Sequence, residues 1–267
     1  MNKQEILNKY KNEEERLLVA KTMDKIEFVE VKNKITNTDF LDMYQKNLLQ
    51  KLINSIKYDN YLFFGGNEES ERTVLIFYPN KFNQAIVEKN YNNIMGVIEI
   101  ILPNELKGKY THRDYLGGLM KLGIKREKIG DIIVFDEGAH IIVLNEIINF
   151  VKENIAGLTR FSKASIQIKT IEELRVKKIC IEETKIIVSS LRVDNVIAEL
   201  TKTSRTKAEE IIKSGRVFVN FENITKDSKI LKEEDIITIR GKGRFKLIKI
   251  EGNTKKGKSV VNIGKYT

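Results

Sequence analysis

Hydrophobic residues recur every three or four positions through the first part of the chain, among acidic residues and lysines, and this spacing predicts amphipathic helices. The polar stretch Thr36-Asn37-Thr38-Asp39 interrupts the pattern, so we expect helices on either side of it. Together these segments predict a helical N-terminal unit, residues 1–57.

After Tyr58 the pattern changes to short hydrophobic runs separated by turn residues, which is typical of strands. The predicted strands lie near residues 61–64, 73–78, 94–102, 131–135 and 139–144, and the predicted helices near 82–89, 111–122 and 145–154. Strands and helices that alternate at this length predict a compact α/β sandwich of the split βαβ kind, which many RNA-recognition modules use.

Two further strands, 163–169 and 177–188, are assigned to the end of this middle domain and its linker, so that the domain comprises residues 58–189. Cys180 is the only cysteine of the chain, which excludes an internal disulfide and a thiolate metal site. Because isoleucines flank it in an alternating pattern, Cys180 is expected to be a buried, inert strand residue.

The last part, residues 190–267, is predicted to contain two short helices, a glycine turn and several strands. Ser204 stands where the second helix needs an N-cap, and Gly215 stands where a helix C-cap needs positive φ. Strands are expected from Val217 and at 236–240, 245–250 and 259–263, with a hairpin turn at 241–244 and a flexible basic loop at 252–258. The predicted fold class is therefore α+β, in three parts.

Positive charge is concentrated in this last part. The whole chain has a formal net charge of +10, but residues 1–189 contribute only +2 and residues 190–267 contribute +8. From residue 236 onward, nine cationic side chains accompany a single acidic residue, Glu251. A lysine-rich composition explains the number of lysines better than their clustering, so we expect a polyanion as the partner.

The same region resembles a known RNA-binding domain at many positions. The matching residues are Arg192-x-Asp194, Ser204-Arg205-x-x-Ala208, Gly215-x-Val217-x-Val219-Asn220, Ser228, Asp235 and Arg240-Gly241-x-Gly243-Arg244. From Leu191 to Phe245 they resemble the domain named after small-subunit ribosomal protein S4. One departure is Phe221-Glu222, because many members have a glycine after the asparagine.

An S4-type domain implies binding of folded RNA through phosphates and shape. We expect one face to carry these contacts, and the predicted residues are Arg192, Lys202, Ser204, Arg205, Lys207, Arg216, Lys242 and Arg244. Asp194 is expected to orient Arg192 or to cap its helix locally. A second, smaller basic patch is predicted in the middle domain, from Arg113, Lys125 and Arg126.

Arg113 belongs to the triplet His112-Arg113-Asp114, where a histidine near an aspartate raises the question of acid–base catalysis. Adjacent residues on a helix point about 100° apart, so the triplet does not form one site. Thr111, three positions before Asp114, instead predicts a capping box. Two histidines and one cysteine offer no metal-ligand spacing, and His140, in an alternating strand, is expected to be packed or partly exposed.

Over most of its length the chain resembles the YlmH family of Gram-positive bacteria, because the stretch Tyr110 to Asp131 accompanies an N-terminal helical unit and an S4-type domain. The resemblance implies an RNA-binding protein without catalysis that takes part in ribosome-associated quality control. It implies ribosomal RNA of the large subunit as the partner, with peptidyl-tRNA as a further candidate. We expect a monomer that needs no metal and no cofactor.

Two other functions stay open. The first is an RNA-modifying enzyme of the pseudouridine synthase kind, although His112-Arg113-Asp114 matches its arginine-leucine-aspartate context only in part. The second is a cell-division factor, since the family is named for a locus near cell-division genes. The charged N-terminus and the lack of a long apolar run predict a cytoplasmic protein without a membrane span.

Overall fold

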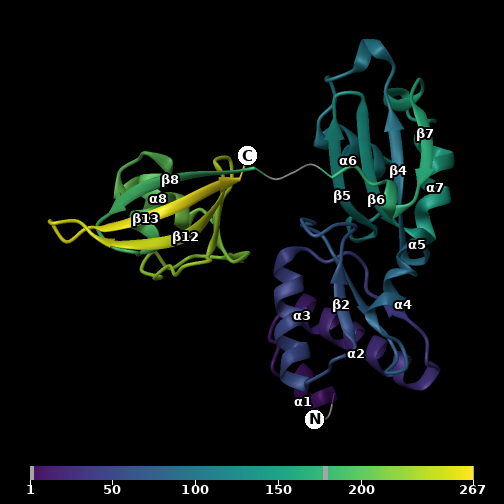
Figure 1. Ribbon diagram of the computed structural model, residues 1–267, viewed down its shortest axis with the longest axis horizontal. Coiled ribbons are helices and arrows are strands. Elements are labelled where there is room, and N and C mark those ends of the chain that lie inside the picture. Colours follow the sequence, from purple (N-terminus) through teal and green to yellow (C-terminus); the bar gives the residue numbers. More distant parts are fainter. Residues whose placement is uncertain (1–2, 177–179, 267) are drawn as a thin grey trace. The chain divides into compact units, whose positions relative to one another are not determined.

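Figure 1 shows the computed structural model, which describes residues 3–176 and 180–266. The chain forms two compact units, Met1–Lys177 and Lys178–Thr267, and each buries hydrophobic residues of its own. Each unit therefore has the internal packing of an independent domain. Among the described helices, none is both long enough and apolar enough to cross a membrane.

The first unit begins with three helices, α1 (Lys3–Leu7), α2 (Glu13–Lys32) and α3 (Met43–Ile56). Asn12 caps α2 by accepting backbone hydrogen bonds, and Asp42 and Gln45 form a capping box at α3. The helices pack against a sheet of order β1-β3-β2, with bounds Thr36–Asn37, Val74–Phe77 and Tyr61–Phe64. The predicted helices are present, but they share one core with strands that lie beyond residue 57.

The middle of this unit is a four-stranded antiparallel sheet. Its elements follow in the order β4 (Met95–Ile101), α6 (His112–Lys121), β5 (Ile129–Phe135), β6 (Gly138–Leu144), α7 (Asn145–Ile155) and β7 (Ser165–Lys169). The strand order β5-β6-β4-β7 places β6 between β4 and β5, and β4 between β6 and β7, so both βαβ units are split. The predicted split βαβ sandwich is confirmed.

Short helical segments connect these elements. They are α4 (Gln84–Glu88), α5 (Tyr91–Ile94) and the 3-10 helices η1 (Asn104–Leu106), η2 (Arg126–Lys128), η3 (Thr159–Phe161) and η4 (Ile171–Glu173). Helices α6 and α7 pack on the middle sheet through a core that includes Tyr115 and Phe161. Phe40, from the N-terminal part, packs with Val97 and Ile142 of the sheet in a second cluster, which joins the two parts into one unit.

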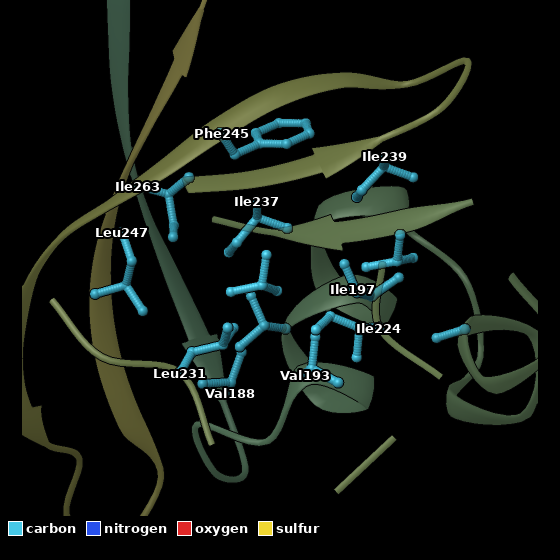
Figure 2. Packing of buried hydrophobic residues seen from close by; sticks show 14 of the residues in the cluster. Val188, Val193, Ile197, Ile224, Leu231, Ile237, Ile239, Phe245, Leu247 and Ile263 are labelled. Carbon is cyan, nitrogen blue, oxygen red and sulfur yellow. The ribbon is translucent and has the colours of Figure 1, made fainter. Parts of the chain in front are cut away.

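The second unit is a six-stranded antiparallel sheet of order β10-β9-β11-β12-β13-β8, against which α8 (Val193–Thr201) and α9 (Arg205–Lys213) pack. The strands are β8 (Ile181–Val188), β9 (Val217–Val219), β10 (Glu222–Asn223), β11 (Ile236–Ile239), β12 (Gly243–Asn253) and β13 (Ser259–Tyr266). Figure 2 shows Val193 and Ile197 of α8 in one core with Ile237, Ile239 and Phe245 of the sheet. Because β12 continues to Asn253, the predicted basic loop is shorter than expected.

Strand β8 corrects two expectations. It pairs with β13 along its whole length, from Ile181↔Tyr266 to Val188↔Ser259, so it belongs to the C-terminal sheet and not to the middle domain. Cys180 precedes this strand and is exposed, so the expected burial is wrong. Residues 177–179 of the predicted strand lie outside the described residues.

Candidate nucleic-acid interface

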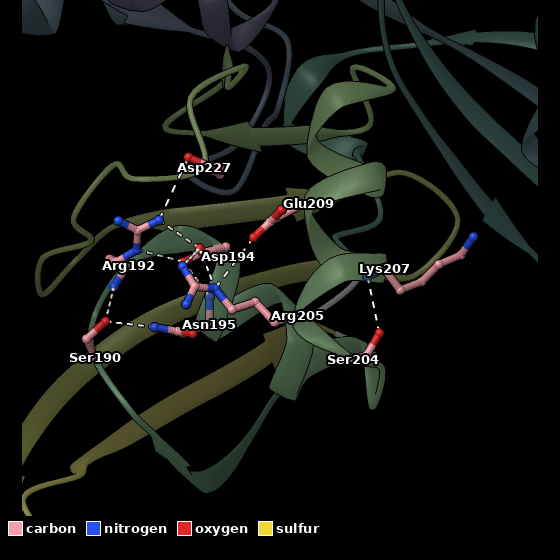
Figure 3. A network of polar contacts seen from close by, with 9 residues as sticks. All are labelled: Ser190, Arg192, Asp194, Asn195, Ser204, Arg205, Lys207, Glu209 and Asp227. Atoms are coloured by element: carbon pink, nitrogen blue, oxygen red, sulfur yellow. Dashed lines mark hydrogen bonds and ion pairs between the residues drawn. The ribbon is translucent and has the colours of Figure 1, made fainter.

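The joint between α8 and α9 fixes the start of the second helix. Lys202 caps α8 with a φ of 53°, and the Ser204 hydroxyl accepts a hydrogen bond from the Lys207 backbone N–H (3.3 Å), as Figure 3 shows. The N-cap predicted for Ser204 is confirmed. The cap sets the direction of Arg205 in the first turn of α9.

Asp194 is the centre of the polar network beside this joint. Its side chain is fully buried, and its carboxylate accepts hydrogen bonds from Arg192 (2.9 and 3.2 Å) and Arg205 (2.7 and 2.9 Å), as Figure 3 shows. The Asn195 backbone N–H donates a further bond of 2.9 Å. Asp194 therefore orients Arg192, as its spacing indicated, and also Arg205, which its spacing did not indicate.

Burial by itself raises the pKa of the Asp194 carboxyl. The hydrogen bonds from Arg192, Arg205 and the Asn195 N–H outweigh this effect, so the pKa lies below its ordinary value. The same hydrogen bonds raise the pKa of Arg192. Asp194 is thus ionised at neutral pH, and its charge holds both guanidinium groups.

The predicted cations around Asp194 lie on the side of the unit formed by α8 and α9, which we call the helical side. Each of them has a carboxylate neighbour other than Asp194. The pairs are Arg192 with Asp227 (3.8 Å), Arg205 with Glu209 (3.6 Å), Lys207 with Glu210 (2.6 Å) and Lys202 with Glu199. One carboxylate oxygen each of Asp194, Glu209 and Asp227 lies within 4.8 Å of the others, and the two guanidinium groups offset two of these three negative charges. The helical side therefore offers oriented donors rather than excess positive charge.

The other predicted cations lie near the turn between β11 and β12. Arg216 donates a hydrogen bond to the Arg240 carbonyl oxygen (2.8 Å), and the Arg240 N–H donates to the Arg216 carbonyl oxygen (2.9 Å). Lys242 is exposed in the turn itself. Among the described residues, Arg216, Arg240 and Lys242 have no carboxylate partner. Uncompensated positive charge is therefore found on this side of the unit.

Aromatic rings accompany these arginines. The Arg240 guanidinium carbon lies 4.8 Å from the centre of the Phe218 ring, and that of Arg244 lies 5.6 Å from Phe221 and 5.9 Å from Tyr266. Arg240 and the three rings are further candidate residues; Arg240 belongs to the matching S4-type motif, but none of the four was among the predicted RNA-binding residues. The sequence signal for these contacts was the presence of arginines and aromatic residues in neighbouring strands. Only the strand register shows which arginine lies beside which ring.

The expectation of a single binding face does not hold. Ile237, Ile239 and Phe245 are buried against the helices, so their neighbours Thr238 and Arg244 point to the opposite face of the sheet. The predicted residues are thus divided between a helical side, around Asp194, and a sheet side, around Arg244.

The second basic patch, in the middle domain, also differs from the prediction. Arg113 and Lys125 are exposed, but the Arg126 guanidinium donates to the carbonyl oxygens of Ile129 (2.6 Å) and Gly130 (3.2 Å). Burial, together with the positive charge of Arg72, lowers the pKa of Arg126 to about 10. Arg126 therefore supports the start of β5, and only Arg113 and Lys125 remain as surface cations of the patch.

Asp114 has the capping role that its spacing predicts. Its carboxylate accepts hydrogen bonds from the Thr111 backbone N–H and hydroxyl, both 2.8 Å, and pairs with Arg160 at 2.7 Å. Hydrogen bonds from Thr111 lower the pKa of Asp114, whereas burial and the charge of Arg126 lower the pKa of His112. The two residues of the triplet therefore have separate surroundings and do not form an acid–base pair.

His140 is packed, as predicted. It is 2% exposed, its Nε2 lies 3.1 Å from a Glu99 carboxylate oxygen, and its Nδ1 accepts the Arg175 backbone N–H at 3.1 Å. Since Nδ1 accepts, Nε2 carries the proton of the neutral ring. These contacts give His140 a structural role in joining the end of the middle domain to its sheet.

A cavity of about 770 Å³ lies in the first unit, between α2, the segment after β1 and the start of α7. Its walls mix Lys21, Lys25 and Lys128 with Asp39 and Glu146. Lys128 pairs with both of these acids at 2.6 Å, so the cavity has no clear preference for an anion. None of the predicted RNA-contacting residues lines it.

Comparison with known proteins gives matches over both units. Residues 87–174 match the family described as “Putative RNA-binding domain in YlmH”, and residues 191–237 match the S4 domain family. The “Ribosome-associated protein quality control protein P2” of Bacillus subtilis (strain 168) is 31% identical over 249 residues, 92% of this chain and 93% of that protein. The solved structure “Cell division protein ylmH from Streptococcus pneumoniae” covers 61% of this chain and 96% of its own, at 22% identity and a TM-score of 0.47.

Proposed function

We propose that this chain, which belongs to the YlmH family, is a non-catalytic RNA-binding protein that acts on the ribosome. The observation that carries the proposal is the uncompensated positive charge of Arg216, Arg240 and Lys242 in a domain of the S4 family. Cationic side chains without a carboxylate partner stay available to phosphate oxygens, which supply most of the affinity in RNA binding.

The RNA we propose is ribosomal RNA of the large subunit, with peptidyl-tRNA as a second contact. The name of the Bacillus subtilis relative, which refers to ribosome-associated protein quality control, supports this choice, and the match extends over nearly all of both chains. In this role the protein is a cytoplasmic monomer that binds to the ribosome rather than to a free substrate.

The residues of the His112 triplet support the proposal that the chain is not an enzyme. A general acid or base must reach the proton that it transfers, and a catalytic carboxylate must be free to act. The Asp114 carboxylate instead accepts a hydrogen bond from the Thr111 backbone N–H and pairs with Arg160. RNA binding by positioned cations requires no such group.

The substitution Lys242→Gln tests the proposal, because Lys242 is exposed in a turn and its removal leaves the core intact. We expect the variant to bind purified large ribosomal subunits more weakly in sedimentation assays. The slope of log K against log salt concentration should become shallower by about 1, as expected for one lost phosphate contact.

Lys185→Gln is the matched control, since Lys185 is in the same sheet but pairs with Glu251 at 2.7 Å. It should bind with the affinity and the salt dependence of the wild type. Sedimentation of the wild type with small subunits alone would contradict the choice of subunit. If the wild type binds neither subunit, or if both variants bind as it does, the proposal is wrong.

A further inference from the structure

We propose that the sheet side of the C-terminal unit is a stacking platform for unpaired RNA bases, formed by Phe218, Phe221, Arg240, Arg244 and Tyr266. The inference rests on the proposed RNA-binding function and specifies which form of RNA this side recognises. In this proposal, unpaired bases stack on these rings, and double-helical RNA is bound by other contacts.

The strand register places two of the platform residues, Phe218 and Arg244, in one row. Thr238 of β11 pairs with Phe218 of β9 on one side and with Arg244 of β12 on the other. Cross-strand partners point to the same face, and Ile237 and Ile239, the neighbours of Thr238, are buried against the helices. Phe218 and Arg244 are therefore on the face that points away from α8 and α9, and both are partly exposed.

The strongest support for the platform is the position of Phe221. The hairpin between β9 and β10 has a two-residue turn, Asn220 and Phe221, with φ of 50° and 68°. Positive φ at both central positions is the geometry of a type I′ turn, which strongly favours glycine at the second position. A bulky residue in the left-handed region is strained, and such strain is kept where a side chain is needed for function.

The strained turn places the Phe221 ring 5.6 Å from the Arg244 guanidinium carbon, and the Tyr266 ring lies 5.9 Å from the same carbon. Every base has a flat face that stacks on an aromatic ring or on a guanidinium plane, whatever its sequence. The nearby cations Arg216 and Lys242 supply charge for the phosphates that link successive bases. In a duplex the base faces are already stacked, so this combination fits unpaired RNA.

The substitution Phe221→Gly separates function from stability, because it removes the ring and supplies the residue that the turn prefers. The probes are a fluorescent oligoadenylate, an abasic strand of the same length and an RNA duplex. We expect the wild type to bind oligoadenylate more tightly than the abasic strand. In the variant this affinity should fall about tenfold, within the range for one lost stacked base, while the melting temperature stays equal or rises.

Ile187→Ala is the control, since Ile187 is 52% exposed on β8 at the far end of the same sheet, and it should change none of the affinities. Equal affinity of the wild type for oligoadenylate and the abasic strand, with duplex binding retained, would refute the platform and leave the proposed function intact. The same holds if Phe221→Gly binds oligoadenylate as the wild type does. If the wild type binds none of the three RNAs, the platform is refuted, whereas the proposed function is refuted only by the absence of binding to ribosomal subunits.

Discussion

At the scale of single residues, Asp194 combines full burial with a negative charge. A buried carboxylate without partners is very costly, and two guanidinium groups and a backbone N–H offset that cost here. Because Arg192 and Arg205 keep 32% and 54% of their side chains exposed, each can still donate to a partner in solution. One buried charge thus orients two surface donors that come from different helices.

Asp194→Asn is expected to lower the free energy of unfolding of the C-terminal unit by at most about 3 kcal/mol at neutral pH, the lower end for a broken buried pair. The folded-state pKa of Asp194 is depressed, so its stabilisation is present above the unfolded pKa, about 4, and is lost as the pH falls through the folded value. Urea unfolding of both proteins from neutral to acidic pH measures this effect. The stabilities should converge below about pH 4, and a constant difference would contradict the role of the charge.

At the scale of elements, α6 contains two adjacent glycines in different surroundings. A Cβ atom at Gly118 would lie 2.5 Å from the Phe161 ring, whereas a Cβ atom at Gly117 would meet nothing within 4 Å. The close packing of α6 on the 3-10 helix that contains Phe161 therefore depends on one glycine of the two.

Gly118→Ala is expected to destabilise the first unit by about 1–3 kcal/mol, because the new methyl group overpacks the core. Gly117→Ala, its matched control, should stabilise the same helix by about 0.5–1 kcal/mol, because glycine is a poor helix former. Thermal unfolding of the two variants beside the wild type measures both effects. If Gly118→Ala raises the melting temperature as Gly117→Ala does, Phe161 moves away from the new methyl group without cost.

Local signals explain which elements the sequence could predict. The capping box of Thr111 and the alternation before Leu144 act within a few residues, so α6 and β6 were predicted to within about two residues, the usual error of helix and strand ends. Pairing over long distances left no local signal. Nothing in β8 indicates that its partner is β13, and therefore the strand was assigned to the wrong part of the chain.

The candidate site shows the same division. Ser204 was identified by its position before a helix, whereas the contact of Arg205 with Asp194 depends on how α8 and α9 pack. Arg126 has the charge of an RNA-binding residue, and only the structure shows that it binds backbone carbonyl oxygens. The row of Phe218 and Arg244 requires the register of three strands.

At the scale of the whole molecule, the two units have separate hydrophobic cores. The buried residues of the C-terminal core run from Ile186 to Ile263, all of them within that unit. We therefore expect residues 178–267 to fold as an isolated fragment with a cooperative urea transition, since the core that stabilises it is complete. Circular dichroism during urea unfolding tests this expectation, and the fragment 1–177 is measured in the same way for comparison. A gradual transition in the C-terminal fragment would show that its core needs the first unit.

The single passage of the chain between the two units has a kinetic consequence. Each unit contains a match to an RNA-binding family, so both can contact one large RNA particle. Because both units belong to one chain, binding of one unit raises the effective concentration of the other near that particle. A unit that dissociates is then recaptured before the whole molecule diffuses away, so two weak contacts give a long residence time.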